Sequence, residues 1–419
     1  MTLVPKTVVC LFTFLAIVYA QQPQSRVEEI QQKRQNKAAQ LAPETAPKTE
    51  QNFVAFREKH ILEKITYGIG GLRARVGGLV TGSGFALGPE YFRDDLASGD
   101  VRFRVTTQFS LSQYQLYDVE LAFPKLVDEH AFFELHATHR NFPRMDYYGQ
   151  GPDSEKTGRS NYRLEDTNFS FASGVRPSRH FRAGVTGGFT EINVGPGTHE
   201  SRVSTEQIYT PYPRVVNTEF GPRIEPGTVG IDRQTDFLQG GVFAQFDYRD
   251  IAGGPRSGGN YLARFTYNKD VDLRQHTHRR LELEAQQYIP FFNQRRVIAL
   301  RARSELTYKN RNQSLPFYMQ PTLGGSNDLR GFRPFRFYDD NLIIFNAEYR
   351  YEIFSGMDMA IFGDAGKVFH SKMDWNVHDL EAAYGIGMRF NARNTVFMRV
   401  DAGFSHEGFQ VWVKFNNVF

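Results

Sequence analysis

The feature that most constrains this chain is a period-two alternation of apolar and polar side chains, which recurs from about residue 66 to the C-terminus. In the segment 342–353, "LIIFNAEYRYEI", Ile, Phe, Ala and Tyr occupy one set of alternate positions, and mostly polar residues occupy the other. The segments 114–123, 279–289 and 409–415 repeat the pattern. Because successive side chains of a strand point to opposite faces, this pattern predicts strands whose two faces lie in different environments.

The two faces differ in a way that favours a membrane barrel over a soluble sandwich. The polar faces carry dense charge, as at Arg301, Arg303 and Glu305, and the apolar faces are rich in Tyr and Phe near the ends of the runs. Aromatic residues at both ends of an apolar band are typical of outer-membrane barrels. In lipid, strands satisfy all their backbone hydrogen bonds only when they close into a barrel. The sequence therefore predicts an all-β, transmembrane, antiparallel β-barrel.

The alternating segments number about sixteen, and closed bacterial barrels prefer an even number of strands. The first two fall within residues 66–92. The others are expected near 101–111, 114–123, 131–140, 160–173, 180–192, 235–248, 259–268, 278–289, 296–307, 341–353, 357–363, 381–390, 395–404 and 409–419. Short connections alternate with the long segments 141–159, 193–234 and 308–340, as periplasmic turns alternate with extracellular loops. Segment 308–340 is then the sixth extracellular loop, between the eleventh and twelfth strands.

The N-terminus has the pattern of a secretory signal peptide over residues 1–20. Lys6 precedes the apolar run "TVVCLFTFLAIV", and small residues lead to a cleavage site at Ala20. The only cysteine, Cys10, lies inside that run, so the mature chain is predicted to have no disulfide and no Cys-ligated zinc. Residues 21–65 are rich in Gln, Lys and Glu and contain three prolines, which indicates a periplasmic tether or helix ahead of a barrel over 66–419.

Composition excludes several other classes of protein. The net charge is +4 with acidic and basic residues nearly balanced, which argues against a dedicated nucleic-acid binder. A mean hydropathy of −0.47 excludes a polytopic helical membrane protein. The aromatic content of 14% and the 37 glycines suit strands joined by many turns.

Motifs for catalysis, metal binding and cofactor binding are weak. The two histidines of "HTH" (276–278) share a strand face but lack a carboxylate as third ligand, so no metal site is predicted. The stretch "YGIGGLR" (67–73) lacks the third glycine of a dinucleotide fingerprint. No Gly-x-Ser-x-Gly nucleophile elbow occurs, and no catalytic constellation can be assembled. We therefore expect no enzyme activity and no cofactor.

Two short motifs resemble a known family. "LRGF", formed by Leu329, Arg330, Gly331 and Phe332, resembles the sixth-loop signature of the BamA/TamA-type outer-membrane assembly-factor (bacterial surface antigen) superfamily, which includes the two-partner-secretion transporters. "FGDAG" (362–366), on the expected thirteenth strand, is similar to that superfamily's Phe-x-Asp-x-Gly signature. Its matching residues are Phe362, Asp364 and Gly366.

Two further features extend the resemblance over residues 66–419. "NAEYRY" (346–351) places Glu348 where the family tends to carry an inward-facing acid on the twelfth strand. The last strand, with Phe415 and the terminal Phe419, is similar to the signal that the barrel-assembly machinery reads. The resemblance implies a monomeric barrel of the cell outer membrane, inserted by that machinery, which acts in the assembly or translocation of proteins or lipids.

The chain departs from the familiar members at its N-terminus. Those members carry periplasmic POTRA modules, and residues 21–65 are too few to hold one, so the chain resembles a POTRA-less branch. This departure leaves open whether a separate periplasmic protein is a partner. Two other functions also remain open: a passive porin-like diffusion channel, and a surface structural or adhesive barrel that uses the loops 141–159 and 193–234.

The sixth loop is predicted to fold inward. Arg330 keeps its charge under all conditions, and its planar fork pairs with carboxylates through two hydrogen bonds. Asp364 and Glu348 are expected to face the lumen on adjacent strands, so Arg330 can bind between them. Gly331 permits a close approach of the backbone, and Phe332 can pack on the inner wall. The alternative, a solvated surface arginine with two unrelated acids, stays open at this stage.

Overall fold

The computed structural model describes residues 30–33, 35–36, 69–218, 221–392 and 395–415. The chain divides into two units, Met1–Phe56 and Arg57–Phe419. In the first unit, the described residues are helical. None of the helices in the described part of the chain is long and apolar enough to cross a membrane. The predicted signal peptide lies outside the described residues, and so does most of the predicted tether.

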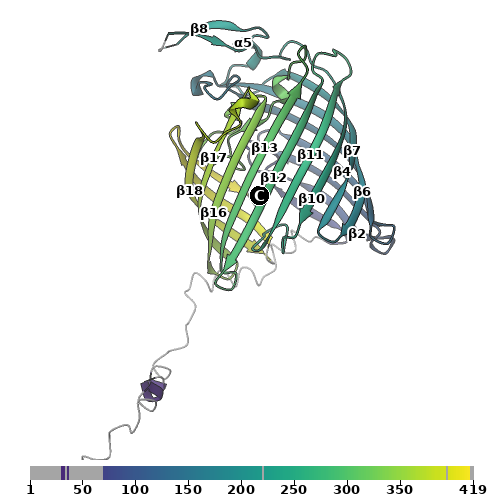
Figure 1. Cartoon of the computed structure of the whole chain (residues 1–419), viewed down its shortest axis with the longest axis vertical. Helices are drawn as coiled ribbons and strands as arrows, with labels where there is room; N and C mark the ends of the chain where they lie inside the picture. Colours follow the sequence, from purple (N-terminus) through teal and green to yellow (C-terminus); the bar gives the residue numbers. More distant parts are fainter. Residues whose placement is uncertain (1–29, 34, 37–68, 219–220, 393–394, 416–419) are drawn as a thin grey trace, which may run out of the picture. The chain divides into compact units, whose positions relative to one another are not determined.

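The second unit contains one sheet of sixteen strands, each antiparallel to its neighbours (Figure 1). Its strands, in order, are β1 (Leu72–Gly77), β2 (Ala86–Leu96), β3 (Val101–Ser110), β4 (Gln115–Leu126), β5 (Ala131–Tyr147), β6 (Ser160–Ser178), β7 (Phe181–Pro196), β10 (Phe237–Asp247), β11 (Gly258–Asp270), β12 (His278–Phe291), β13 (Arg296–Lys309), β16 (Asn341–Phe354), β17 (Met357–Phe369), β18 (Glu381–Ala392), β19 (Thr395–Ser405) and β20 (Gly408–Lys414). The predicted fold class and number of strands are confirmed.

Small elements occupy the connections. The remaining elements are α5 (Thr205–Ile208), the hairpin of β8 (Arg214–Thr218) and β9 (Gly221–Glu225), the pair β14 (Thr322–Leu323) and β15 (Phe337–Tyr338), and the short 3-10 turns η1 (Ala97–Gly99), η2 (Lys156–Gly158), η3 (Phe317–Met319) and η4 (Lys372–Asp374). The predicted extracellular loop 193–234 therefore carries a helix and a hairpin of its own.

Strands β5, β6 and β7 are longer than the alternation predicted. Antiparallel pairing continues past the alternating segments, as between Asp146 and Asn161 and between Tyr162 and Pro196. Backbone pairing does not require alternating side chains, and in β5 the register shifts between Phe142 and Met145, so the strands continue without a regular alternation in the sequence. The predicted loop 141–159 consequently begins as strand and is reduced to residues 148–159.

The side chains on the two faces of the barrel wall are distributed as expected for a barrel in lipid. On β13, the outward side chains of Ile298 and Leu300 are 37% and 40% exposed, whereas the inward, charged Arg301 and Glu305 are 8% and 7% exposed. Apolar side chains on the outside of the wall and charged ones within are the reverse of a soluble sandwich. This arrangement is the pattern of a membrane barrel.

The connection between β13 and β16 (residues 310–340) contributes to two buried apolar clusters. One cluster joins its Leu323, Leu329, Phe332 and Phe337 to Leu342 and Ile344 of β16, Val368 of β17 and Ala383 of β18. The other joins its Phe317 and Tyr338 to Tyr114, Phe142, Met145, Tyr147, Tyr162 and Tyr209. Burial of these side chains holds the connection against the strands, because each contributes about 1.5–3 kcal/mol when fully buried.

The two edges of the sheet meet with few contacts. Within the described residues, β1 and β20 form no ladder of backbone pairs. The rings of Phe85 and Phe415 pack with centroids 5.6 Å apart, and Lys414 Nζ donates to the carbonyl of Val80 at 3.4 Å. Phe415 of the predicted assembly signal therefore lies at this seam. Phe419 lies outside the described residues.

A charge on the outward face of β13 tests the orientation of the wall. We expect Leu300→Arg to destabilise the folded barrel in lipid vesicles by about 2–4 kcal/mol, because an arginine near the middle of the bilayer is poorly solvated. Unfolding in urea, followed by the loss of the compact band on a gel without heating, measures the change. Asn312→Arg is the control, because Asn312 lies in an exposed polar turn of the connection that follows β13. This variant should unfold at the same urea concentration as the wild type. Equal stability of the two variants would contradict the outward assignment of Leu300.

Candidate functional site

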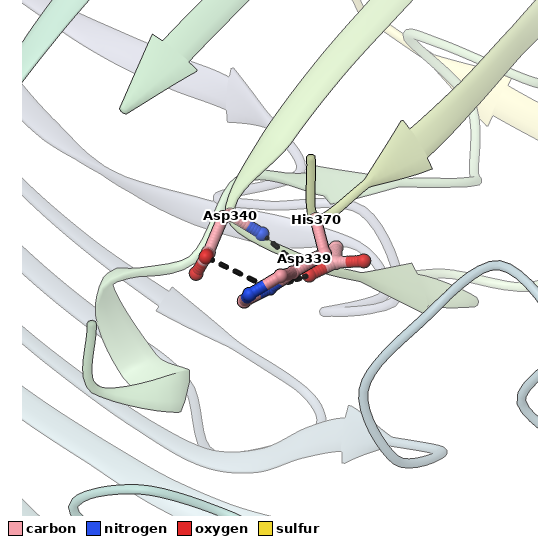
Figure 2. A group of neighbouring side chains, drawn as sticks. All are labelled: Asp339, Asp340 and His370. Carbon is pink, nitrogen blue, oxygen red and sulfur yellow. Dashed lines mark hydrogen bonds and ion pairs between the residues drawn. The ribbon is translucent and has the colours of Figure 1, made fainter. Parts of the chain in front are cut away.

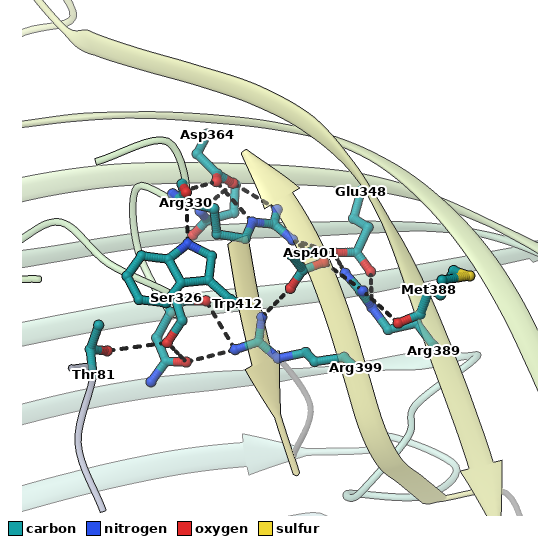
Figure 3. Close-up of polar contacts among 12 residues, drawn as sticks. Thr81, Ser326, Arg330, Glu348, Asp364, Met388, Arg389, Arg399, Asp401 and Trp412 are labelled. Atoms are coloured by element: carbon teal, nitrogen blue, oxygen red, sulfur yellow. Dashed lines mark hydrogen bonds and ion pairs between the residues drawn. The ribbon is translucent and has the colours of Figure 1, made fainter. Parts of the chain in front are cut away.

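Arg330 lies against the inner faces of β16 and β17 with its side chain fully buried (Figure 3). Its Nε and Nη2 donate to the two carboxylate oxygens of Asp364, each at 2.8 Å. Its Nη1 donates to Glu348 Oε2 at 2.7 Å, and its backbone N–H donates to Asp364 at 3.1 Å. Two parallel hydrogen bonds to one carboxylate fix the plane of the guanidinium group as well as its position.

Two glycines allow the backbone to reach this position. Gly325 has a φ of +110°, and a Cβ there would lie 2.3 Å from the side chain of Thr81. A Cβ on Gly331 would lie 2.6 Å from the backbone of Phe404 in β19. Only glycine fits at both positions, because a side chain would collide and the left-handed backbone at Gly325 disfavours other residues.

Aromatic side chains complete the environment of the guanidinium group. The Arg330 Cζ lies 3.4 Å from the centroid of the Phe362 ring, within range of a cation–π interaction. Phe332 packs edge-on against Phe337, with centroids 5.5 Å apart, inside the apolar cluster that also holds Leu329. Gly366 lies apart from these groups: it pairs with Ile344, and a Cβ there would lie 2.8 Å from the carbonyl oxygen of Ile343.

The structure extends the site beyond the residues that the sequence singled out. Arg389 of β18 donates to Glu348 at 2.8 Å and to Asp401 of β19 at 2.6 Å. Asp401 also accepts from Arg399 at 2.5 Å. Arg350 of β16 donates to the second oxygen of Glu348 at 2.8 Å. We call this set the lumenal ion cluster; it consists of Arg330, Glu348, Arg350, Asp364, Arg389, Arg399 and Asp401, all buried.

Arg389, Arg399 and Asp401 were not among the site residues predicted from the sequence. The available signal was their inward position on the two strands that follow β17. The cluster has four guanidinium groups and three carboxylates. Part of the excess positive charge is directed at neutral acceptors, since Arg399 Nη2 donates to Ser326 O and Asn327 Oδ1 at 2.9 and 2.8 Å.

The same connection touches both edges of the sheet (Figure 3). Trp412 of β20 donates its indole N–H to the carbonyl of Arg330 at 2.8 Å. On the other side, the hydroxyl groups of Thr81, just after β1, and Ser326 lie 3.2 Å apart. Residues 326–330 therefore contact the first and the last strand regions from one position.

A second ionic group joins the end of this connection to the end of β17 (Figure 2). His370 Nδ1 lies 3.0 Å from Asp340 and 3.5 Å from Asp339, and Lys309 Nζ lies 2.5 Å from Asp340. Hydrogen bonds that the His370 ring donates to the carboxylates of Asp339 and Asp340 raise the pKa of His370 to about 10. The ring is therefore charged at neutral pH, so that His370 and Lys309 together balance the charges of the two carboxylates.

The histidines of "HTH" serve the backbone. His276 Nδ1 lies 3.0 Å from the carbonyl oxygen of Ser314, and His278 Nδ1 lies 2.8 Å from that of His276. Both side chains are buried. The two histidines therefore bind backbone carbonyl groups. Among the described residues, Asp339, Asp340 and His370 form the one cluster whose potential ligand atoms lie as close together as a metal site requires.

Comparison with known proteins identifies related barrels. A family model described as the Omp85 superfamily domain matches residues 101–405. BamA from Haemophilus ducreyi, in a crystal structure lacking POTRA domains 1–3, matches with a TM-score of 0.58 and 12% identity, covering 83% of this chain and 69% of that chain. CdiB from Escherichia coli matches with a TM-score of 0.51 and 13% identity, covering 84% of this chain and 63% of that chain. At these identities the two structures show a shared fold. No curated protein sequence matches the chain.

Removal of the central cation tests the lumenal ion cluster. We expect Arg330→Ala to destabilise the folded barrel by about 3–5 kcal/mol, because it leaves the carboxylates of Asp364 and Glu348 buried without the guanidinium group that both of them bind. Urea unfolding in vesicles measures the change. Arg264→Ala is the control, because Arg264 also pairs with an acid, Glu282, but is 44% exposed. Such an exposed pair contributes about 0–1 kcal/mol. If the two variants lose the same stability, Arg330 is not a buried ion-pair partner.

The pH dependence of stability tests the His370 group. A histidine whose pKa is raised on folding stabilises the folded state fully below its unfolded pKa of about 6.5 and loses that contribution as the pH rises to about 10. Between pH 6.5 and 9.5, wild type should therefore lose more stability than His370→Gln. His406→Gln, which removes a histidine outside this group, is the control for the substitution itself. Equal slopes for wild type and His370→Gln would refute the assignment.

Proposed function

Because the chain belongs to the Omp85 superfamily, we propose that it acts in the insertion or translocation of proteins, or of lipids, at the outer membrane. It is an outer-membrane β-barrel, as the family match and the related structures indicate. The observation that carries the proposal is the seam between β1 and β20, together with the loop that touches both of its sides.

The edge strands of the sheet are suited to separation. β1 has six residues and β20 has seven, fewer than any other strand of the sheet. Unpaired backbone groups on such an edge can bind an incoming strand, as in strand addition to an open sheet. In this function, a client segment pairs with one edge while the wall opens beside it.

Residues 326–330 are placed to control that opening. The Trp412 indole holds β20 through the carbonyl of Arg330, and Ser326 meets Thr81 beyond β1. The ion pairs of Arg330 with Asp364 and Glu348 anchor the same residues to β16 and β17. A loop fixed at one end and in contact with both edges sets their separation. Its presence inside the wall also narrows the lumen, which weighs against the porin-like alternative.

A reversible crosslink across the seam tests this function. A Cβ on Gly77 would lie 3.6 Å from the Cβ of Phe415, within the separation that a disulfide spans. The double variant Gly77→Cys/Phe415→Cys, in the mature chain without Cys10, should close the seam when oxidised. We expect the wild-type protein in lipid vesicles to accelerate the folding of a urea-denatured small outer-membrane barrel. The oxidised variant should lose that acceleration and regain it after reduction.

Each single-cysteine variant serves as a control for strain at Gly77, where φ is +152°. A wild-type protein that folds the client no faster than empty vesicles would overturn the insertion activity. If the oxidised variant were as active as the reduced one, the protein would still have the insertion activity, but the client would not pass through the seam. Large, stable conductance in planar bilayers would instead favour the porin-like channel.

A further inference from the structure

A row of side chains on the outward face of the wall is buried where lipid contact would be expected. Ser304 of β13, Ile343 of β16 and Lys367 of β17 are direct cross-strand neighbours on that face. They are only 7%, 8% and 7% exposed. Nearer the periplasmic end of the same strands, the outward Leu300 and Ile361 are 40% and 55% exposed. Another part of the protein therefore covers the row formed by Ser304, Ile343 and Lys367.

The cover is the connection between β17 and β18. The Trp375 indole N–H donates to Ser304 Oγ at 3.2 Å. Lys367 Nζ donates to Asn376 Oδ1 at 2.8 Å and to the carbonyl of His378 at 3.0 Å. Residues 371–378, which we call the outer strap, thus lie across the outside of the wall from β17 to β13. The middle strand, β16, contributes the buried Ile343 between these two contacts.

Three large apolar side chains of the outer strap are exposed, beside the exposed polar residues Lys372, Asp374 and His378. Met373, Trp375 and Val377, at alternate positions, are 90%, 52% and 64% exposed. These side chains lie on the outside of the wall, beside its extracellular end, and are continuous with the apolar belt formed below by Leu300 and Ile361. Tryptophan at this level of a membrane protein is typical of the boundary between acyl chains and headgroups.

We propose that the outer strap is a membrane anchor, which inserts Met373, Trp375 and Val377 into the outer leaflet at the boundary of acyl chains and headgroups. Its partner is lipid, because the strap continues a surface that is itself in contact with lipid. This inference holds whatever the barrel inserts or transports.

The charges around the outer strap fit this placement. Lys367 would face lipid on the bare wall, and an ammonium group without partners is costly there. The strap supplies two acceptors to Lys367 and excludes lipid from it. Lys372 Nζ lies 4.0 Å from the ring centroid of Tyr308, near the extracellular end of β13, where its charge can meet anionic headgroups.

The position of the anchor has a consequence for the barrel. The outer strap covers β16 and β17, whose inner faces carry Glu348 and Asp364. In the order of the sheet, β17 lies three strands from the edge strand β20, and β16 lies four strands from it. The wall that holds Arg330 is thereby attached to lipid from outside, while the seam has no such attachment among the described residues.

Spin labels on single cysteines test the anchor in the full mature chain, which is predicted to lack cysteine. Labels at Met373→Cys, Leu300→Cys and Asn312→Cys report the outer strap, the lipid-facing wall and an aqueous loop. In vesicles of outer-membrane lipid, collision with oxygen marks a label in lipid, and collision with a water-soluble nickel chelate marks one in water. We expect the ratio of collisions with oxygen to collisions with the nickel chelate at Met373 to lie near the ratio measured at Leu300. A ratio equal to that of Asn312 would overturn the proposal.

A second measurement leaves the outer strap unlabelled. Lipids brominated near the headgroup should quench the part of the tryptophan emission that Trp375→Phe removes, and lipids brominated at the chain ends should quench it less. Trp412, the other tryptophan, donates a hydrogen bond to the carbonyl of Arg330 inside the wall. Its emission should not be quenched by either lipid and provides the background. Quenching of the Trp375 emission by aqueous acrylamide, but by neither lipid, would refute lipid contact.

Discussion

The arrangement of the lumen depends on one buried cation that cannot lose its charge. Arg330 is removed from solvent, so its guanidinium group requires negative partners in fixed places. Asp364 supplies two oxygens and Glu348 a third, and these acids lie on adjacent strands. Any displacement of residues 326–330 would leave at least one buried charge without its partner. The position of the whole connection is therefore coupled to the register of β16 and β17.

The ion pairs do not stop at Arg330. Glu348 is shared with Arg350 and Arg389, and Arg389 continues to Asp401 on β19. Consecutive strands are thus linked by charged side chains on the inside as well as by backbone pairing. Beyond them, β20 is linked to the same loop through Trp412. The region next to the seam is consequently held mainly from within, while β16 and β17 are also covered from outside by residues 371–378.

Particular elements show how far sequence reasoning reaches. The alternation in 342–353 and 409–415 predicted strands and their inward faces, because a side-chain period of two is local information. It did not predict the ends of β5, β6 and β7, where the backbone pairing continues without a regular alternation of side chains. It did not identify Arg389 as a partner of Glu348, because the two residues are 41 positions apart and meet only through strand register. The alternation also gave no indication of the outer strap, because its contacts with Ser304 and Lys367 depend on the path of the loop.

By itself, the sequence determined the kind of structure and the chemistry available to it: alternating strands for a barrel of sixteen, a permanently charged arginine in a glycine-containing loop, and acids on two neighbouring strands. Only the tertiary structure decided which charges meet. The reason is physical: ion pairs and cross-strand contacts depend on strand register and on the path of loops, which are set only when the whole chain folds. The folded barrel places Trp412 and Thr81 beside one loop, although 331 positions separate them.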